Sequence, residues 1–158
     1  MSVAEGALAV AVLFAGPWSG LLAMLTTILH PMLAAMDGRG FRLFLGSFLS
    51  FARKAWFNYA CSIGMGVAPI VALVALWDDR SGAAFILTAI GWVLVILGVY
   101  VVANVWKEPH YDVMLSWNPE AMPPDWERGR RRYFTLNWIN AGSTWAAFAL
   151  FLGALQTV

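Results

Sequence analysis

The sequence predicts an all-α fold in which four transmembrane helices form one bundle. Hydrophobic residues make up 61% of the 158-residue chain and charged residues only 12%, which is about half the charge of a typical soluble domain. Four apolar runs reach the roughly 20 residues that a helix needs to cross a bilayer, and none has a charged residue in its interior. The strict alternation of a lipid-facing β-barrel is absent.

The apolar runs define the expected spans within one integral membrane domain, residues 1–158. The spans are about 6–30, 55–77, 83–106 and 133–156. Nine tryptophans lie mostly near the edges of these runs, as in the aromatic belts of membrane proteins. The lipid bilayer is therefore the first expected partner, and an alanine-, glycine- and tryptophan-rich chain of this size indicates a bacterial plasma membrane.

Basic residues orient the bundle. Nine of the ten lysines and arginines fall in loop one, before the second span, or in loop three, after the third span. Loop two, between the second and third spans, carries only Arg80. Because cytoplasmic loops are enriched in Lys and Arg, we expect loops one and three to be cytoplasmic and both termini to lie outside. The run "RGRRRY" is then a topology anchor, and a net charge of +1 gives no reason to expect nucleic-acid binding.

Both cytoplasmic loops are expected to be ordered. In "FRLFLGSFLSFAR", residues 41–53, apolar side chains recur at helical spacing, which predicts an amphipathic helix that lies in the membrane interface or leads into the second span. Loop three, residues 107–132, is long and rich in aromatic residues. Loops of this length are usually functional or disordered, and its apolar content favours an ordered segment that folds over the mouth of the bundle.

Every span brings a polar side chain to the cytoplasmic end. These are His30, Asn58, Asn104, Asn137 and Asn140, with Thr144 on the face of the last two. An amide in hydrocarbon without a partner costs several kcal/mol, so these groups are expected to meet inside the bundle. Polar groups within a membrane often mark a functional site; the alternative is that the asparagines only cap helices and join them.

The last third of the chain resembles the anthrone oxygenase-like proteins, a family of small four-helix membrane proteins of mostly unknown function. The resemblance rests on residues 104–109, on "MLSWNPEAMPPDW" (114–126), on "RGRRR", on "NWIN" (137–140) and on "HPMLAAMD" at the exit of the first span. The chain departs from the family in two places. The segment after the third span is longer and more charged, and Asn140 stands where the family commonly has an arginine.

This resemblance implies an oxidoreductase that oxidises a phenolic anthrone with dioxygen, without an organic cofactor. We expect His30 to act as the base and Asn104, Asn137 and Asn140 to stabilise the oxygen that becomes negatively charged. The side chains expected to contact a hydrophobic aromatic molecule are Asn58, His110, Tyr111, Trp117, Trp126 and Thr144.

The sequence leaves other classes open. One is a non-catalytic accessory subunit of a larger membrane complex or a homo-oligomer; another is an electron-transfer protein that binds haem, copper or quinone; a small transporter is a third. No cofactor is predicted, but His30 and His110 are the two residues that a metal or haem would use. The single cysteine, Cys61, excludes an internal disulfide.

Overall fold

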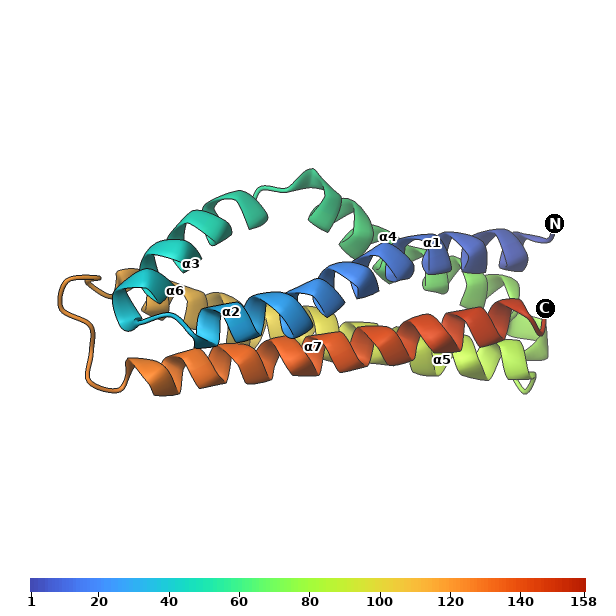
Figure 1. Ribbon diagram of the computed structural model, residues 1–158. Coiled ribbons are helices and arrows are strands. Elements are labelled where there is room, and N and C mark those ends of the chain that lie inside the picture. The colour runs from blue at the N-terminus through green and yellow to red at the C-terminus, as the bar shows by residue number, and fades with distance from the viewer.

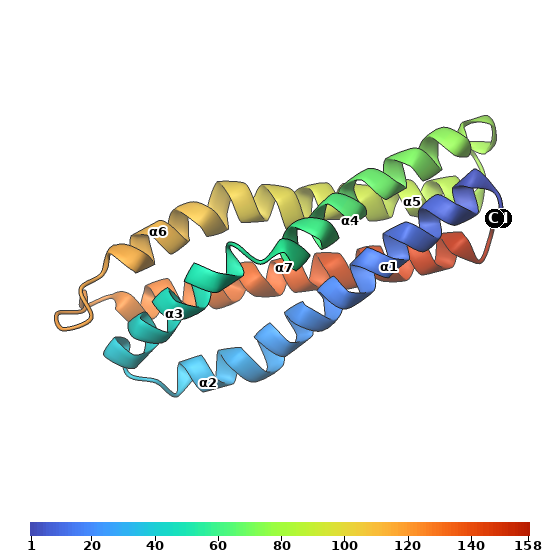
Figure 2. The ribbon, with the colours of Figure 1, turned by 90° about the horizontal axis from the view of Figure 1, so that it is seen from above.

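The computed structural model covers all 158 residues and has no β-strand. Its four longest helical spans are Val3–Ala34, Trp56–Ala75, Ala83–Ser116 and Trp126–Leu155, and each is long and apolar enough to cross a membrane. This confirms the all-helical fold with four apolar helices. Figures 1 and 2 show an elongated bundle with both termini at one end.

The first span is built from three helical segments. They are α1 (Val3–Met24), a π-helical turn η1 (Leu25–Leu29) and α2 (His30–Ala34). A capping box starts α1: the Ser2 hydroxyl accepts from the Glu5 amide at 3.1 Å, and the Glu5 carboxylate accepts from the Ser2 amide at 2.6 Å. This arrangement satisfies amide groups that a helix start otherwise leaves unpaired. Asp37 then caps the next helix, α3 (Gly38–Ala52), through the Gly40 amide at 2.8 Å.

The third span is longer than the apolar run alone indicates. It combines α5 (Ala83–Leu94), a π-helical segment η3 (Val95–Lys107) and α6 (Glu108–Ser116). The expected loop over residues 107–132 is therefore mostly helix, and only residues 117–125 connect α6 to α7 (Trp126–Leu155). Pro109 does not stop the helix although it lies inside the continuous span: the turn before it is π-helical, and such local adjustments let membrane helices tolerate a proline. The polar stretch lengthens the helix beyond the apolar part.

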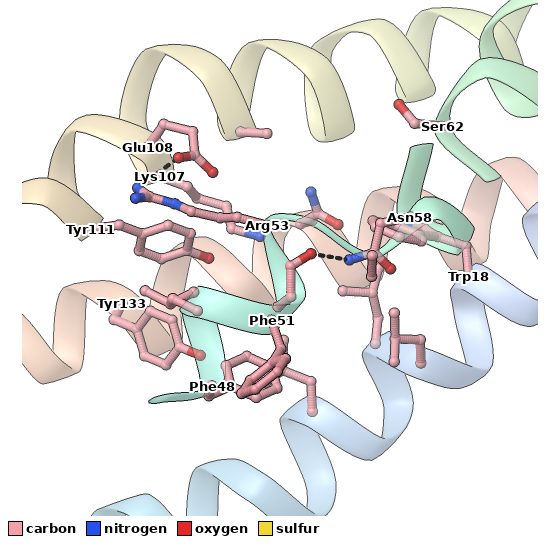
Figure 3. Close-up of a pocket in the computed structure, with 18 of the residues that line it drawn as sticks. Trp18, Phe48, Phe51, Arg53, Asn58, Ser62, Lys107, Glu108, Tyr111 and Tyr133 are labelled. Carbon is pink, nitrogen blue, oxygen red and sulfur yellow. Dashed lines mark hydrogen bonds and ion pairs between the residues drawn. The ribbon is translucent and has the colours of Figure 1, made fainter. Parts of the chain in front are cut away.

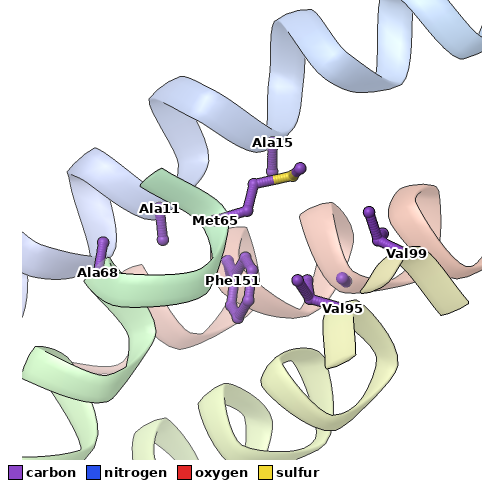
Figure 4. Close-up of a cluster of buried hydrophobic side chains, with 8 residues drawn as sticks. Ala11, Ala15, Met65, Ala68, Val95, Val99 and Phe151 are labelled. Atoms are coloured by element: carbon purple, nitrogen blue, oxygen red, sulfur yellow. The ribbon is translucent and has the colours of Figure 1, made fainter. Parts of the chain in front are cut away.

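Small residues let the helices meet closely near the termini. Figure 4 shows Ala11 and Ala15 of α1 packed against Met65 and Ala68 of α4 (Trp56–Ala75), with Phe151 of α7 beneath them. All these side chains are buried. Small side chains allow the close approach of helix backbones on which packing in a membrane depends. This contact fixes the closed end of the bundle.

At the opposite end the helices are held apart by larger side chains. The buried face of α3 consists of Phe41, Leu45 and Leu49, which pack in one cluster with Tyr111 of α6 and Tyr133 of α7. In Figure 1, α3 and the start of α4 arch away from α1. A short break at residues 53–55 separates α3 from α4, so the amphipathic helix leads into the second apolar span.

Gly98 provides a test of the close packing. A Cβ atom at Gly98 would lie 2.1 Å from the Cβ of Ser143. A Cβ atom at Gly142, the residue before Ser143 on α7, would meet nothing within 4 Å. We expect Gly98→Ala to destabilise the protein by about 1–3 kcal/mol because the added atom overpacks the contact. Gly142→Ala is expected to be neutral or to stabilise by up to about 1 kcal/mol through helix propensity.

Thermal unfolding in detergent, followed by circular dichroism, measures both effects. Ser143→Gly removes the side chain that the new Cβ meets, so it is expected to restore stability in the Gly98→Ala background. Equal stability of Gly98→Ala and the wild type would contradict the close contact of η3 with α7.

Candidate functional site

A cavity of about 960 Å³ lies where the helices separate. It is lined from α1, η1, α3, α4, η3, α6 and α7, and Figure 3 shows many of the side chains around it. Eighteen of its 27 lining residues are hydrophobic, a composition and size typical of sites for apolar small molecules. Met24, Phe51 and Tyr59 on its rim are exposed, so the cavity opens to the surroundings of the bundle.

Three asparagines bring amides to this cavity. Asn58 Nδ2 donates to the Ala52 carbonyl at 2.8 Å and Asn104 Nδ2 donates to the Tyr100 carbonyl at 2.8 Å. Asn140 differs from them because it is only 1% exposed and its Oδ1 has no hydrogen-bond partner. A buried amide oxygen without a partner is rare in native proteins. Asn140 therefore offers an unused polar group at the inner wall of the cavity.

His30 and Asn137 form a buried pair beside the cavity rather than in it. Asn137 Nδ2 donates to His30 Nε2 at 3.2 Å, so a neutral imidazole carries its hydrogen on Nδ1. The His30 ring stacks on Phe134 at 4.3 Å and lies 5.7 Å from the ring of Tyr133, which does line the cavity. His30 Nδ1 and Asn137 Oδ1 both lack partners, so the pair retains a donor and an acceptor.

The π-helical turn η1 shapes the wall of the cavity just before His30. Thr26 Oγ1 donates to the Leu22 carbonyl at 2.8 Å within this part of the helix. Single π-helical turns inside α-helices are frequent at functional sites, since the extra residue shifts the faces of the helix. Leu25 and Leu29 of this turn line the cavity, while the next residue, His30, points into the α7 contact.

Charged residues gather at one side of the cavity. Arg53 pairs with Glu108 at 2.7 Å and with Asp112 at 2.9 Å, and its guanidinium lies over the Tyr111 ring at 5.6 Å. Burial lowers the pKa of Arg53, but the hydrogen bonds and negative charges of Asp112 and Glu108 outweigh it, and the pKa lies above its ordinary value. The second cation here, Lys107, makes no ion pair and lies 5.9 Å from the centre of the same ring.

The structure brings together part of the set expected from the sequence. Four of these residues line the cavity: Asn58, Asn104, Tyr111 and Asn140. His30 and Asn137 are buried next to it in the contact between the first and fourth spans, and Thr144 is buried on α7, where its hydroxyl donates to the Asn140 carbonyl.

Three residues expected in the site lie elsewhere. His110 Nε2 is 2.8 Å from the Gly129 carbonyl, so it joins α6 to α7. Trp117 packs over Gly129, and Trp126 lies under the Arg130 guanidinium at 4.6 Å. None of the three lines the cavity: His110 lies on the side of α6 that contacts α7, and Trp117 and Trp126 lie at the two ends of the connection between α6 and α7.

Among the lining residues that sequence reasoning missed are Arg53, Lys107, Glu108 and Tyr133. A signal for Lys107 was present, since Tyr100, Asn104, Lys107 and Tyr111 follow one another at spacings of four, three and four residues. Such spacing places side chains on one face of a helix. The charge of Lys107 ended the apolar run and so hid the continuation of this face.

Metal ligands are not gathered in the bundle. No three His, Cys, Asp or Glu side chains are placed to hold a metal ion together. His110 uses Nε2 in its contact with Gly129, and His30 uses Nε2 in its contact with Asn137, so the two histidines belong to different helix contacts. Compared with family models, curated proteins and solved structures, the chain gives no match. The resemblance to anthrone oxygenase-like proteins therefore depends on its sequence motifs alone.

A double-mutant cycle tests the His30–Asn137 contact. His30→Phe keeps a flat ring against Phe134 and Asn137→Leu keeps the volume, but each removes one partner of the hydrogen bond. Either change alone is expected to cost about 1–3 kcal/mol because it leaves a buried polar atom unpaired, and a coupling energy of about 1 kcal/mol is expected between them.

Asn104→Leu is the matched control for this cycle. Asn104 is exposed and bonds only within its own helix, so its loss is expected to change stability by less than about 0.5 kcal/mol. Additive effects of the His30 and Asn137 substitutions in detergent unfolding would show that the two side chains do not interact.

Proposed function

We propose that the chain is an integral protein of a bacterial plasma membrane with its cavity at the cytoplasmic side. The basic residues support this orientation: Arg39, Arg53 and the "RGRRR" run lie at or toward the end of the bundle away from the termini, and Arg80 lies on the turn at the terminal end. Lys and Arg mark cytoplasmic segments. In this orientation α3 places its exposed Leu43 and Phe51 in the interface of the membrane.

We propose further that the cavity binds a phenolic polycyclic aromatic molecule and oxidises it with dioxygen. One observation carries the proposal: a large, mostly apolar cavity ends on the unpartnered amide of Asn140, with the His30–Asn137 pair buried behind Tyr133. Flat apolar molecules partition into such a cavity from the bilayer. The motifs that resemble anthrone oxygenases supply the reaction class.

The chemistry needs few protein groups. An anthrone loses a proton from its ring methylene to give an electron-rich anion, and this anion reacts with dioxygen; overall one anthrone and one dioxygen give one anthraquinone and one water. In this proposal Nε2 of His30, the ring nitrogen without a hydrogen, receives the proton through water when the Asn137 amide turns away from it; until then Asn137 holds the imidazole in its orientation beside the cavity. Nδ2 of Asn140 donates a hydrogen bond to the ring oxygen that gains negative charge.

Oxygen uptake with purified protein and an anthrone tests this function. We expect wild-type protein to accelerate oxygen consumption and the appearance of the quinone absorption band. His30→Ala, Asn137→Ala and Asn140→Leu are expected to lower kcat by about 10²-fold or more, the usual contribution of a general base or an oxyanion donor. Full activity of both His30→Ala and Asn137→Ala would contradict the assigned roles.

Two phenylalanine substitutions distinguish the effect of filling the cavity from the effect of adding an aromatic ring elsewhere on the protein. Ala103→Phe fills the cavity that Ala103 lines and is expected to raise KM or abolish turnover. Ala149→Phe adds the same ring to the exposed face of α7 and is expected to leave turnover unchanged. A wild-type protein without activity that co-purifies with stoichiometric partners would instead support an accessory subunit, and a visible spectrum lost in His30→Ala would support a redox cofactor.

A further inference from the structure

Lys107 is a cation that the protein leaves without a counter-ion. Its side chain lines the cavity, and Figure 3 shows it beside Arg53, Glu108 and Tyr111. Both nearby carboxylates, those of Glu108 and Asp112, form ion pairs with Arg53, at 2.7 and 2.9 Å. No carboxylate lies within 4 Å of Lys107, whereas the Tyr111 ring has both cations within 6 Å of its centre.

This arrangement is electrostatically incomplete. A half-buried ammonium beside apolar side chains loses hydration that an anion has to replace. A negatively charged group bound in the cavity would remove this cost. Asn140, which also lines the cavity, is buried, and its Oδ1 has no hydrogen-bond partner in the protein.

Lys107 lies at the depth in the membrane where the polar headgroup of an amphiphile is expected. Lys107 lies within the continuous helical span Ala83–Ser116, roughly 30 Å or more from its start at Ala83. This distance equals the thickness of the hydrocarbon core, so the ammonium lies at the level of the polar headgroups. The apolar walls from Trp18, Leu22 and Val99 continue from there toward the middle of the bundle.

We propose that Lys107 binds the anionic oxygen of an amphiphilic ligand whose apolar body fills the cavity. This inference deepens the proposed function and rests on it for the aromatic nature of the ligand: the ionised oxygen of a phenolic substrate would pair with Lys107. Nδ2 of Asn140 donates a hydrogen bond to the ligand's second oxygen, the ring oxygen that gains charge in the proposed reaction. Arg53 acts indirectly, because it holds Glu108 and Asp112 away from Lys107.

Equilibrium binding of non-reactive probes tests the role of Lys107. Anthracene-2-carboxylate and 2-anthracenemethanol have the same ring system, but only the first is anionic at pH 7, and both accept energy from excited tryptophan such as the cavity residue Trp18. We expect wild-type protein in neutral detergent to bind the carboxylate about tenfold more tightly than the alcohol, a ratio typical of one charge-assisted contact.

Three variants test whether the preference for the carboxylate over the alcohol depends on the charge of Lys107. Lys107→Gln is expected to abolish it while binding of the alcohol is retained, which also shows that the cavity is folded. Lys107→Arg keeps the charge and is expected to keep the preference. Lys54→Gln removes an exposed neighbouring cation outside the cavity and is expected to change nothing. Equal affinity of the wild type for both probes, or a preference that survives in Lys107→Gln, would overturn the proposal.

Arg53→Gln adds an independent readout. It frees Glu108 and Asp112 to approach Lys107, so the preference for the carboxylate is expected to fall even though Lys107 is intact. An unchanged preference in Arg53→Gln would overturn the indirect role given to Arg53.

Competition with oleate distinguishes the two sources of such an anion. Weak displacement of anthracene-2-carboxylate by oleate supports an aromatic ligand. Displacement at lower concentration, lost in Lys107→Gln, keeps Lys107 as the anion site but assigns it to a fatty acid and overturns the aromatic substrate. Because the probes are not oxidised, failure of the oxygen-uptake assay leaves this binding result intact, and the two proposals fail separately.

Discussion

The size of the side chains at the helix contacts decides where this bundle is closed and where it opens. Near the termini, alanines let the first and second spans approach, and farther along the bundle Gly98 lies in close contact with Ser143 of α7. Away from the termini, Phe41, Tyr111 and Tyr133 fill the contacts. Because rings keep helix axes further apart than methyl groups do, α3 and the start of α4 diverge from α1, and the cavity forms between them.

Polar groups gather at the boundary between the closed and open regions. A dry helix contact has no room for an unpaired amide, and the solvated end has no need of a buried one. At the boundary Asn137 pairs with His30, while Asn140 keeps an unpaired oxygen at the cavity wall. The π-helical turn before His30 places Leu25 and His30 on different sides of the first span. Along the same helices, the closely packed contacts are thus followed directly by the region of polar side chains.

The charges at the cavity extend this arrangement toward water. Arg53, at the break between α3 and α4, pairs with two carboxylates of α6 and so joins the second and third spans across the opening. This leaves Lys107 as the charge that faces the cavity without a counter-ion. A site with an apolar body, a buried amide and one free cation suits an amphiphile with an anionic oxygen, which is consistent with oxidation of a phenolic aromatic molecule.

Composition and periodicity by themselves determined the four apolar helices, the amphipathic α3 and the common end for the polar residues, because lipid requires long uncharged helices with polar groups turned inward. Helical spacing also placed Asn137 and Asn140 on one face. Only the tertiary structure decided that His30 lies beside the cavity, that Trp126 is remote from it, and that Lys107 lines it. Those outcomes depend on how far the third helix continues beyond its apolar part and on which charged side chains form ion pairs with one another. Both are set by contacts between segments that are distant in the chain.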